Sequence, residues 1–339
     1  MRRLPIDTFI VLLLTTVGIA TVLPAHGTGA TVAGVVAKLA IALLFFLYGA
    51  RLAPSAILEG ARHLKLHTII FLSTFALFPA LGLAGQALFP HFLTPTLWAG
   101  VILVCTLPST VQSSDAFTSI ARGNVPAALC AATASNMIGI LLTPLLVGLL
   151  LSNGHGGVSA SMVGDIILQL LLPFAAGQAL RRWIGPWVER RRKILSLVDR
   201  GSILIVVYVA FSEGMVAGIW HQLDIAMLLR LALVNAALLG LVLVTTTVLS
   251  RRLGFSRADE ITIVFCGSKK SLASGVPIAS VLFAGSSVGL VVLPLMLFHQ
   301  FQLMVCAALA RHYADAAEKS AQQKAAPWQN TPPNAIFRA

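Results

Sequence analysis

About ten apolar runs, each long enough for a membrane-spanning helix, follow one another along the 339-residue chain. A helix needs roughly 20 apolar residues to cross the hydrocarbon core of a bilayer. Only short polar segments separate the runs. The pattern predicts helices at 8–24, 33–50, 67–89, 96–121, 125–151, 161–181, 201–220, 227–250, 260–284 and 287–310. We therefore expect an all-α integral membrane protein with ten transmembrane helices.

The composition indicates lipid rather than water as the solvent. Hydrophobic residues make up 57% of the chain and charged residues 11%, whereas an ordinary soluble domain carries about a quarter charged residues. The net charge of +12 suggests nucleic acid binding at first sight. However, the basic residues lie between apolar runs, where they determine topology, so we expect no nucleic acid partner. Cysteines lie only inside apolar runs, without a paired motif: Cys105, Cys130, Cys266 and Cys306.

Lysine and arginine residues occur in alternate connections. The intervening connections, around residues 26, 91, 154–157, 221 and 286, contain none. Because cytoplasmic loops carry an excess of Lys and Arg, this alternation predicts an inner membrane protein with both termini in the cytoplasm. The basic segments contain Arg2 and Arg3; Arg51, Arg62 and Lys65; Arg122; Arg181, Arg182, Arg190, Arg191, Arg192, Lys193 and Arg200; Arg251, Arg252 and Arg257; and Arg311, Lys319, Lys324 and Arg338.

The two ends of the chain need separate interpretation. The N-terminal segment has a basic start and an apolar stretch, as a signal peptide has. Asp7 lies at the edge of this stretch, however, and the apolar run continues to about Leu23. We interpret it as the first transmembrane helix, retained in the mature protein, with a cleaved signal peptide as the alternative. Residues 312–339 are polar and rich in Ala, Gln and Pro, which predicts a disordered cytoplasmic tail.

The number of helices predicts an internal symmetry. Ten helices divide into two units of five, residues 1–152 and 153–311. An odd-numbered unit enters the membrane from opposite sides in its two copies, so related halves are inverted repeats. Inverted repeats are common in secondary transporters, whose substrates bind at mid-membrane between broken helices. Interrupted apolar runs should then occur at matching places in the two halves.

Two runs are interrupted by polar residues, and each is the fourth run of its half. A charge at the bilayer centre costs at least ~2.5 kcal/mol, so the interruptions predict a hydrated, protein-lined centre. Alternatively, the ninth run is two short segments joined by a loop that holds both lysines. The first interruption contains Pro108, Ser109, Thr110, Gln112, Ser113, Ser114 and Asp115, and the second contains Gly267, Ser268, Lys269, Lys270 and Ser271.

These interruptions supply most of the predicted substrate- and ion-binding site. We expect Asp115 and Lys270 to form a gating ion pair; in the alternative, an Asp–Lys pair is purely structural. Glu213, in the seventh run, is included because ionisable residues within spans mark transport pathways. We see no HExxH, Walker A or nucleophile-elbow motif, and we predict neither a metal site nor an enzyme. The predicted site is Thr110, Gln112, Ser113, Ser114, Asp115, Ser268, Lys269, Lys270, Ser271 and Glu213.

Five segments spread over the chain carry a recognisable pattern. They are SSDAFTSIARGNVP and ASNMIGILLTPLL in the first half, and QLLLPFAAGQALR, VAFSEGMVAGIWHQL and FCGSKKSLASGVPIA in the second. With these segments the chain resembles the bile acid:sodium symporter family over about residues 5 to 312, closest to the branch typified by its seventh solute-carrier-10 member. The resemblance implies core and panel domains, with the fourth and ninth helices broken and crossing. It also implies uptake of organic anions, coupled to sodium in the better-known branches.

The chain departs from that family where sodium ligands are expected. The resemblance implies a Ser-Asn pair after the first break, a Glu and a Gln around the second, and hydroxyl ligands in the fifth helix. The corresponding residues here are Ser114 and Asp115, Cys266 and Lys270, and Ala128 and Ala132. Hard cations need several oxygen ligands. We therefore hypothesise that Na⁺ is not the coupling ion, or binds weakly, and that the Lys/Asp pair replaces it; H⁺ is the alternative coupling ion.

Two functions stay open at this point. The first is secondary active transport of a small organic anion by alternating access, with Lys269, Lys270 and the positive ends of two half-helices attracting the anion. The second is a non-transporting membrane regulator of ion or solute homeostasis, in which the charged centre has become structural. The expected partners are the small organic anion and membrane lipid, with no cofactor.

Overall fold

The computed structural model describes residues 8–51, 63–151, 167–218, 223–283 and 287–329. All regular secondary structure in these residues is helical, which confirms the all-α prediction, and each of the ten predicted runs contains a helical segment. Six helices are long and apolar enough to cross a membrane, or seven if a bent pair counts as one span. The chain is thus a multi-span membrane protein, while ten spans and inverted repeats stay predictions.

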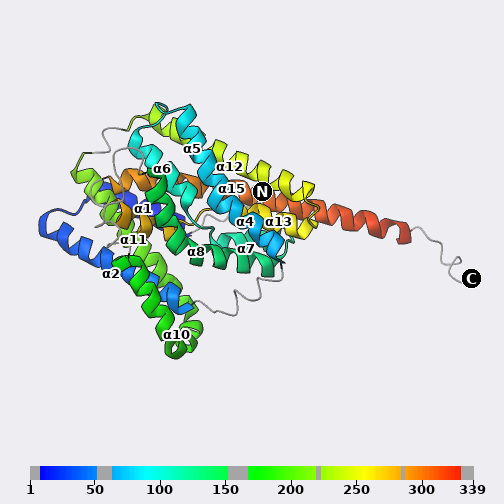
Figure 1. Ribbon diagram of the computed structural model, residues 1–339, viewed down its shortest axis with the longest axis horizontal. Helices are drawn as coiled ribbons and strands as arrows, with labels where there is room; N and C mark the ends of the chain where they lie inside the picture. The colour runs from blue at the N-terminus through cyan, green and yellow to red at the C-terminus, as the bar shows by residue number, and fades with distance from the viewer. Residues whose placement is uncertain (1–7, 52–62, 152–166, 219–222, 284–286, 330–339) are drawn as a thin grey trace, which may run out of the picture.

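Several of the segments are divided into shorter elements (Figure 1). The candidate spans are α2, the stretch from α4 to α5, α8, α11, α12 and α15, and the bent pair is α6 with α7. In chain order the elements are α1 (Thr8–Val22), α2 (Gly27–Arg51), α4 (Leu64–Leu72), the π-helix η2 (Ser73–Leu77), α5 (Phe78–Leu88), α6 (Pro95–Thr106), α7 (Val111–Ile120), α8 (Val125–Leu151), the π-helix η3 (Ile167–Leu171), α10 (Leu172–Arg190), α11 (Arg192–Val216), α12 (Ile225–Arg252), α13 (Arg257–Gly267), α14 (Leu272–Leu282) and α15 (Val288–Gln329).

Polar caps set where several of these helices begin. At the start of α6, the Thr94 side chain accepts a hydrogen bond from Leu97 N (3.4 Å), and Pro95 occupies the first helical position. Asp224 caps α12 and Ser256 caps α13 in the same way. These side chains satisfy N–H groups that the first turn of a helix leaves without partners.

Helices α1, α2, α10 and α11 contact one another at one end of the molecule, on the left and at the bottom of Figure 1. α2 and α10 cross very closely. A Cβ atom on Gly49 would lie 2.1 Å from Phe174 O, and one on Gly177 would lie 2.0 Å from Phe46 O. Helix association in lipid depends on such close packing of small residues, since lipid chains are as apolar as the side chains.

The remaining helices form the larger part of the molecule. α15 packs against α6. The two helices approach closely, since a Cβ atom on Gly100 would lie 2.5 Å from Val291 O. α13 is surrounded by α4, α7, α8 and α12. This arrangement brings the interrupted segments α6–α7 and α13–α14 to the centre of the larger part.

The predicted disordered tail is wrong as far as residue 329. α15 continues from the last apolar run to Gln329 and extends beyond the other helices in Figure 1. Ala, Glu, Lys and Gln are strong helix formers, and elongating an existing helix avoids the cost of a new nucleus. Arg122 forms an ion pair with Glu318 (3.0 Å), and Tyr313 Oη donates to Glu260 Oε1 (3.3 Å). Residues 330–339 lie outside the described residues.

We expect Gly177→Ala to destabilise the protein, because the new methyl group overlaps the Phe46 carbonyl and forces α2 and α10 apart. Overpacking of this kind costs about 1–3 kcal/mol. Thermal unfolding of the purified protein in detergent measures the effect. Gly240→Ala in α12 is the matched control, since no atom lies within 4 Å of its new Cβ position. Equal unfolding temperatures for the two variants would contradict the close crossing.

Candidate functional site

The two predicted interruptions are present, and they touch each other. α6 ends at Thr106 and α7 begins at Val111, with a bend of 61° between them. Pro108 disfavours helical geometry at the residue before it, and Leu107 is accordingly extended (φ −69°, ψ 152°). The second break separates α13 from α14 at residues 268–271. Ser271 N of the second break donates to Pro108 O of the first (2.9 Å).

Lys270 lies between the breaks and is completely buried. Its ammonium donates to the carbonyl oxygens of Thr74 (2.7 Å), Cys105 (2.8 Å) and Leu107 (2.8 Å), which uses every donor that an ammonium has. The group also lies 4.0 Å from the ring centroid of Phe78. The carbonyls at the end of α6 have no partners within the helix and carry the negative end of its dipole. Lys270 therefore caps the broken end of α6.

The sequence around η2 explains why Thr74 O is available to Lys270. In η2 the N–H of Phe78 donates to Ser73 O, five residues back. The next residue, Pro79, has no N–H to donate. Neither usual donor, four or five residues further along the helix, therefore reaches Thr74 O. The π-helix thus presents a carbonyl to the buried ammonium.

Gln302 of α15 holds the backbone of Lys270 in place. Its Oε1 accepts from Lys270 N (2.8 Å), and its Nε2 donates to Lys270 O (2.9 Å). Nε2 also lies 2.8 Å from His299 Nδ1. Because both backbone groups of one residue are bound by one amide, α15 fixes the position of the second break.

Lys269 is also completely buried and points to a different helix. Its Nζ donates to Ser113 O of α7 (2.6 Å) and lies 4.0 Å and 5.3 Å from the ring centroids of Phe117 and Phe265. The two neighbouring lysines therefore hold both sides of the first break, α7 through Lys269 and α6 through Lys270.

The predicted ion pair between Asp115 and Lys270 is wrong. Both lysines of the second break bind backbone carbonyls instead, and Asp115 Oδ1 is buried without a hydrogen-bond partner among the described residues. The carbonyls freed by the break are the acceptors that lie within reach. The ion pair was predicted because only side chains were considered as partners for the charges of Asp115 and Lys270.

Polar side chains of α8 bind the first break from the opposite side. Ser109 N donates to Ser135 Oγ (3.0 Å), and Asn136 Nδ2 donates to Ser109 O (2.6 Å). Asn136 Oδ1 accepts from Ser274 Oγ of α14 (2.9 Å), so this amide bridges the two breaks. Ser135 and Asn136 were not among the predicted site residues. Adjacent Ser and Asn residues within an apolar run were the available signal.

Tyr48 of α2 was also missed, and its hydroxyl lies near Ser274 of α14, beside the second break. One turn further along, Arg51 donates to both carboxylate oxygens of Asp199 in α11 (2.5 and 3.2 Å). This ion pair holds α2 to α11.

The structure brings most of the predicted site residues together at the breaks. Ser114 Oγ donates to Phe265 O (3.4 Å), and Ser271 caps α14. Thr110 and Gln112 lie at the start of α7, with Gln112 exposed. Glu213 lies apart from the breaks, in α11. Buried hydroxyl and carboxyl atoms around the breaks without hydrogen-bond partners in the described part of the chain are Ser113 Oγ, Asp115 Oδ1, Thr118 Oγ1 and Ser268 Oγ.

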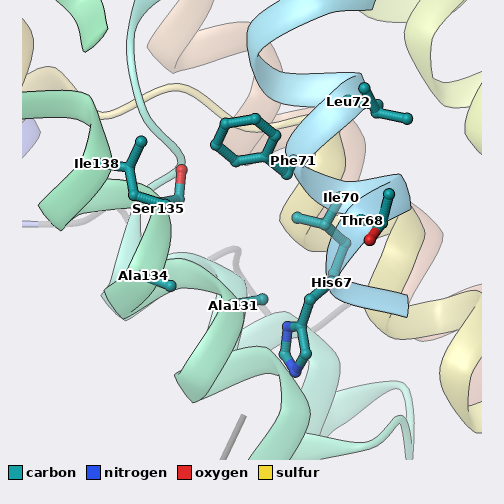
Figure 2. Close-up of a pocket in the computed structure, with 9 residues that line it drawn as sticks. All are labelled: His67, Thr68, Ile70, Phe71, Leu72, Ala131, Ala134, Ser135 and Ile138. Atoms are coloured by element: carbon teal, nitrogen blue, oxygen red, sulfur yellow. The ribbon is translucent and has the colours of Figure 1, made fainter. Parts of the chain in front are cut away.

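A cavity of about 260 Å³ lies beside the first break, between α4 and α8. Figure 2 shows Phe71 and Ile70 of α4 directed toward α8, with His67 at one end of the cavity. Ser135, which binds Ser109 N, forms part of its wall. The lining is otherwise mostly apolar: His67, Thr68, Ile70, Phe71, Leu72, Ala131, Ala134, Ser135 and Ile138.

Comparison with known protein families identifies the family of this chain. The sequence model of the SBF-like CPA transporter family matches residues 7–315. The chain belongs to this family. Because the match covers nearly all of the described helices, including both breaks and α8, the site lies within the family's shared region.

Individual relatives agree with the family match. A protein of Pseudomonas aeruginosa named "Uncharacterized protein PA2026" is 57% identical over 92% of this chain and 94% of its own. "Putative symporter YfeH" of Escherichia coli is 50% identical over 94% of this chain and 96% of its own. "Sodium/bile acid cotransporter 7" of Rattus norvegicus is 29% identical over 80% of each chain. The resemblance to the bile acid:sodium symporter family and to its seventh-member branch is confirmed.

These names describe transporters rather than enzymes. Relatives named as symporters imply that this protein also has a small-molecule substrate. The bacterial relatives indicate that it is an inner membrane protein. Within the described residues no group of three or more His, Cys, Asp or Glu side chains is placed to hold a metal ion.

We expect Gln302→Leu to destabilise the protein by about 1–3 kcal/mol, because Lys270 N and O are then buried without partners. Gln300→Leu is the matched control: it makes the same change two residues away, at a partly exposed position. Thermal unfolding in detergent compares the two variants. The assignment of Gln302 as the clamp of the second break fails if both variants unfold at the same temperature.

Proposed function

We propose that the protein is a secondary active transporter of a small organic anion that works by alternating access, and that the Lys270 ammonium occupies the place of a coupling cation. The proposal depends mainly on the three carbonyl oxygens that surround the Lys270 ammonium at 2.7–2.8 Å. Oxygen cages of this kind also bind hard cations. The ammonium satisfies the same dipoles but stays attached to the chain.

The neighbouring residues support this substitution. Cys266 and Ala128, which stand where the sodium-coupled branches have oxygen ligands, contact each other through Cys266 Sγ and Ala128 O (3.8 Å). Neither side chain offers a hard oxygen. We therefore propose that Na⁺ is not required for transport. Asp115, whose Oδ1 is buried and unpaired, is the available group for a proton if transport is coupled to H⁺.

The helix ends support an anionic substrate. α7 and α14 both begin at the breaks, so their positive dipole ends lie close together at the centre. The N-cap of α7, Thr110, makes no side-chain capping bond, which leaves N–H groups for a ligand. Rocking of α1, α2, α10 and α11 against the break-containing helices is the proposed alternating-access motion, with Tyr48 at the contact. Inverted repeats, residues 1–152 and 153–311, and cytoplasmic termini complete this proposal.

The test of transport is uptake of a panel of labelled carboxylates into proteoliposomes. We expect uptake to change less than about twofold when Na⁺ is replaced by choline, because the cation site is filled by Lys270. Lys270→Ala in folded form should abolish uptake. Strict dependence of uptake on Na⁺ would refute the proposal that Lys270 replaces the coupling cation. Absence of flux for every anion would favour the second function, a membrane regulator. The complete burial of both lysines supports that alternative, because it is consistent with a structural role for the charged centre.

Restoring the ligands of the sodium-coupled branches should restore a response to sodium. In Cys266→Glu/Lys270→Gln the ammonium is replaced by oxygen ligands, and a bound Na⁺ then stabilises the fold by mass action. We expect NaCl, compared with choline chloride, to raise the unfolding temperature of this variant by a few degrees and to leave the wild type unchanged. The matched control is Cys306→Glu/Lys269→Gln, which makes the same two changes around the neighbouring lysine. A sodium response in the wild type, or none in the double variant, contradicts the proposal.

A further inference from the structure

The second half of α10 and the start of α11 carry the densest group of basic residues in the described part of the chain. We name residues 181–197 the α10–α11 corner. Glu189 is the acidic side chain among them. Its basic residues are Arg181, Arg182, Arg190, Arg191, Arg192 and Lys193. The function proposed above makes no use of this group.

Large apolar side chains lie exposed beside these cations. Trp183 is 68% exposed and Trp187 is 52% exposed. The guanidinium of Arg182 lies 5.9 Å from the ring of Trp183, and that of Arg191 lies 5.6 Å from the ring of Trp187. Ile194 and Leu197 add further exposed apolar surface on the α11 side. Tryptophan and arginine together are typical of the level of lipid headgroups, where apolar rings and polar groups meet.

The position of the corner agrees with that level. The candidate span within α11 begins at Lys193, so the basic residues lie at the end of an apolar helix. The inner side of the corner is anchored, because Val188 and Leu195 pack against Leu47 and Ala50 at the end of α2. In Figure 1 α10 accordingly lies at the edge of the molecule beside α2. The cations are therefore held on a fixed outward surface.

Two further features of the corner favour an anion. Arg181 Nε is buried without a hydrogen-bond partner among the described residues. The N-cap of α11, Arg191, makes no side-chain capping bond, and the positive end of the α11 dipole lies in the corner. A phosphate group offers acceptors to both arginine and helix N-termini.

We infer that the α10–α11 corner binds an anionic phospholipid of the cytoplasmic leaflet. The phosphate lies beside the guanidinium groups of Arg182 and Arg191, and the glycerol and acyl chains lie beside Trp183 and Trp187. The exposed apolar residues favour a lipid over free phosphate, because inorganic phosphate leaves them in water. The positive surface is complementary to the negative charge of the leaflet.

The test uses the full-length protein, purified in neutral detergent and titrated with phosphatidylglycerol or phosphatidylcholine while thermal unfolding is followed. Phosphatidylglycerol should raise the unfolding temperature, and phosphatidylcholine should not. Arg182→Gln/Arg191→Gln should weaken the apparent affinity for phosphatidylglycerol about thirtyfold, as expected for two surface charges. Arg252→Gln/Arg311→Gln, which removes two exposed charges elsewhere, is the matched control and should bind as the wild type does.

A second pair of variants distinguishes lipid from free phosphate. Trp183→Ala and Trp187→Ala should each weaken phosphatidylglycerol binding without creating a response to inorganic phosphate. Stabilisation of the wild type by inorganic phosphate to the same extent as by phosphatidylglycerol would overturn the lipid assignment. Equal effects of the two lipids, or an equal loss in the control variant, would overturn the site itself.

Discussion

The hydrogen bonds between the Lys270 ammonium and backbone carbonyls are the interaction on which the centre of this structure depends. Breaking a helix inside a membrane exposes carbonyl groups that water cannot reach, and each is unfavourable without a partner. A buried ammonium alone is equally unfavourable. Lys270 and the end of α6 satisfy each other, and the π-helix η2 contributes the third acceptor. Each break thus supplies hydrogen-bond partners to the other.

The surrounding helices hold this arrangement in register. α15 binds the Lys270 backbone through Gln302, and α8 binds both breaks through Asn136. Lys269 adds a second connection from α13–α14 to α7. Because each contact comes from a different helix, a relative movement of any of them changes the environment of the buried cations. Alternating access, if it moves α1, α2, α10 and α11 as proposed, leaves this network within one rigid part.

A cation that belongs to the chain has a consequence for energy coupling. A bound ion enters and leaves with each cycle, and its gradient drives the substrate. The Lys270 ammonium belongs to the chain and cannot dissociate, so a Na⁺ gradient cannot act through it. In the proposed secondary active transporter, the driving force then comes from the gradient of another coupled ion, with H⁺ as the candidate.

Much of this organisation was already determined by the sequence. The hydrophobic runs gave the helical segments, and the polar clusters around Pro108 and Lys270 gave both breaks, because hydropathy and proline geometry are local properties of the chain. The tail beyond residue 312 was misjudged because its polar composition suits both disorder and a continued helix, and an existing span decides in favour of the helix.

Only the tertiary structure decided what each charge binds. The carbonyls of Thr74 and Cys105 lie 196 and 165 residues from Lys270 along the chain. A carbonyl is present at every residue, so no sequence pattern marks the ones that a break or a π-helix leaves free. Folding selects those acceptors. Lys270 therefore binds backbone carbonyls and not Asp115, although the opposite charges of the two residues had predicted an ion pair.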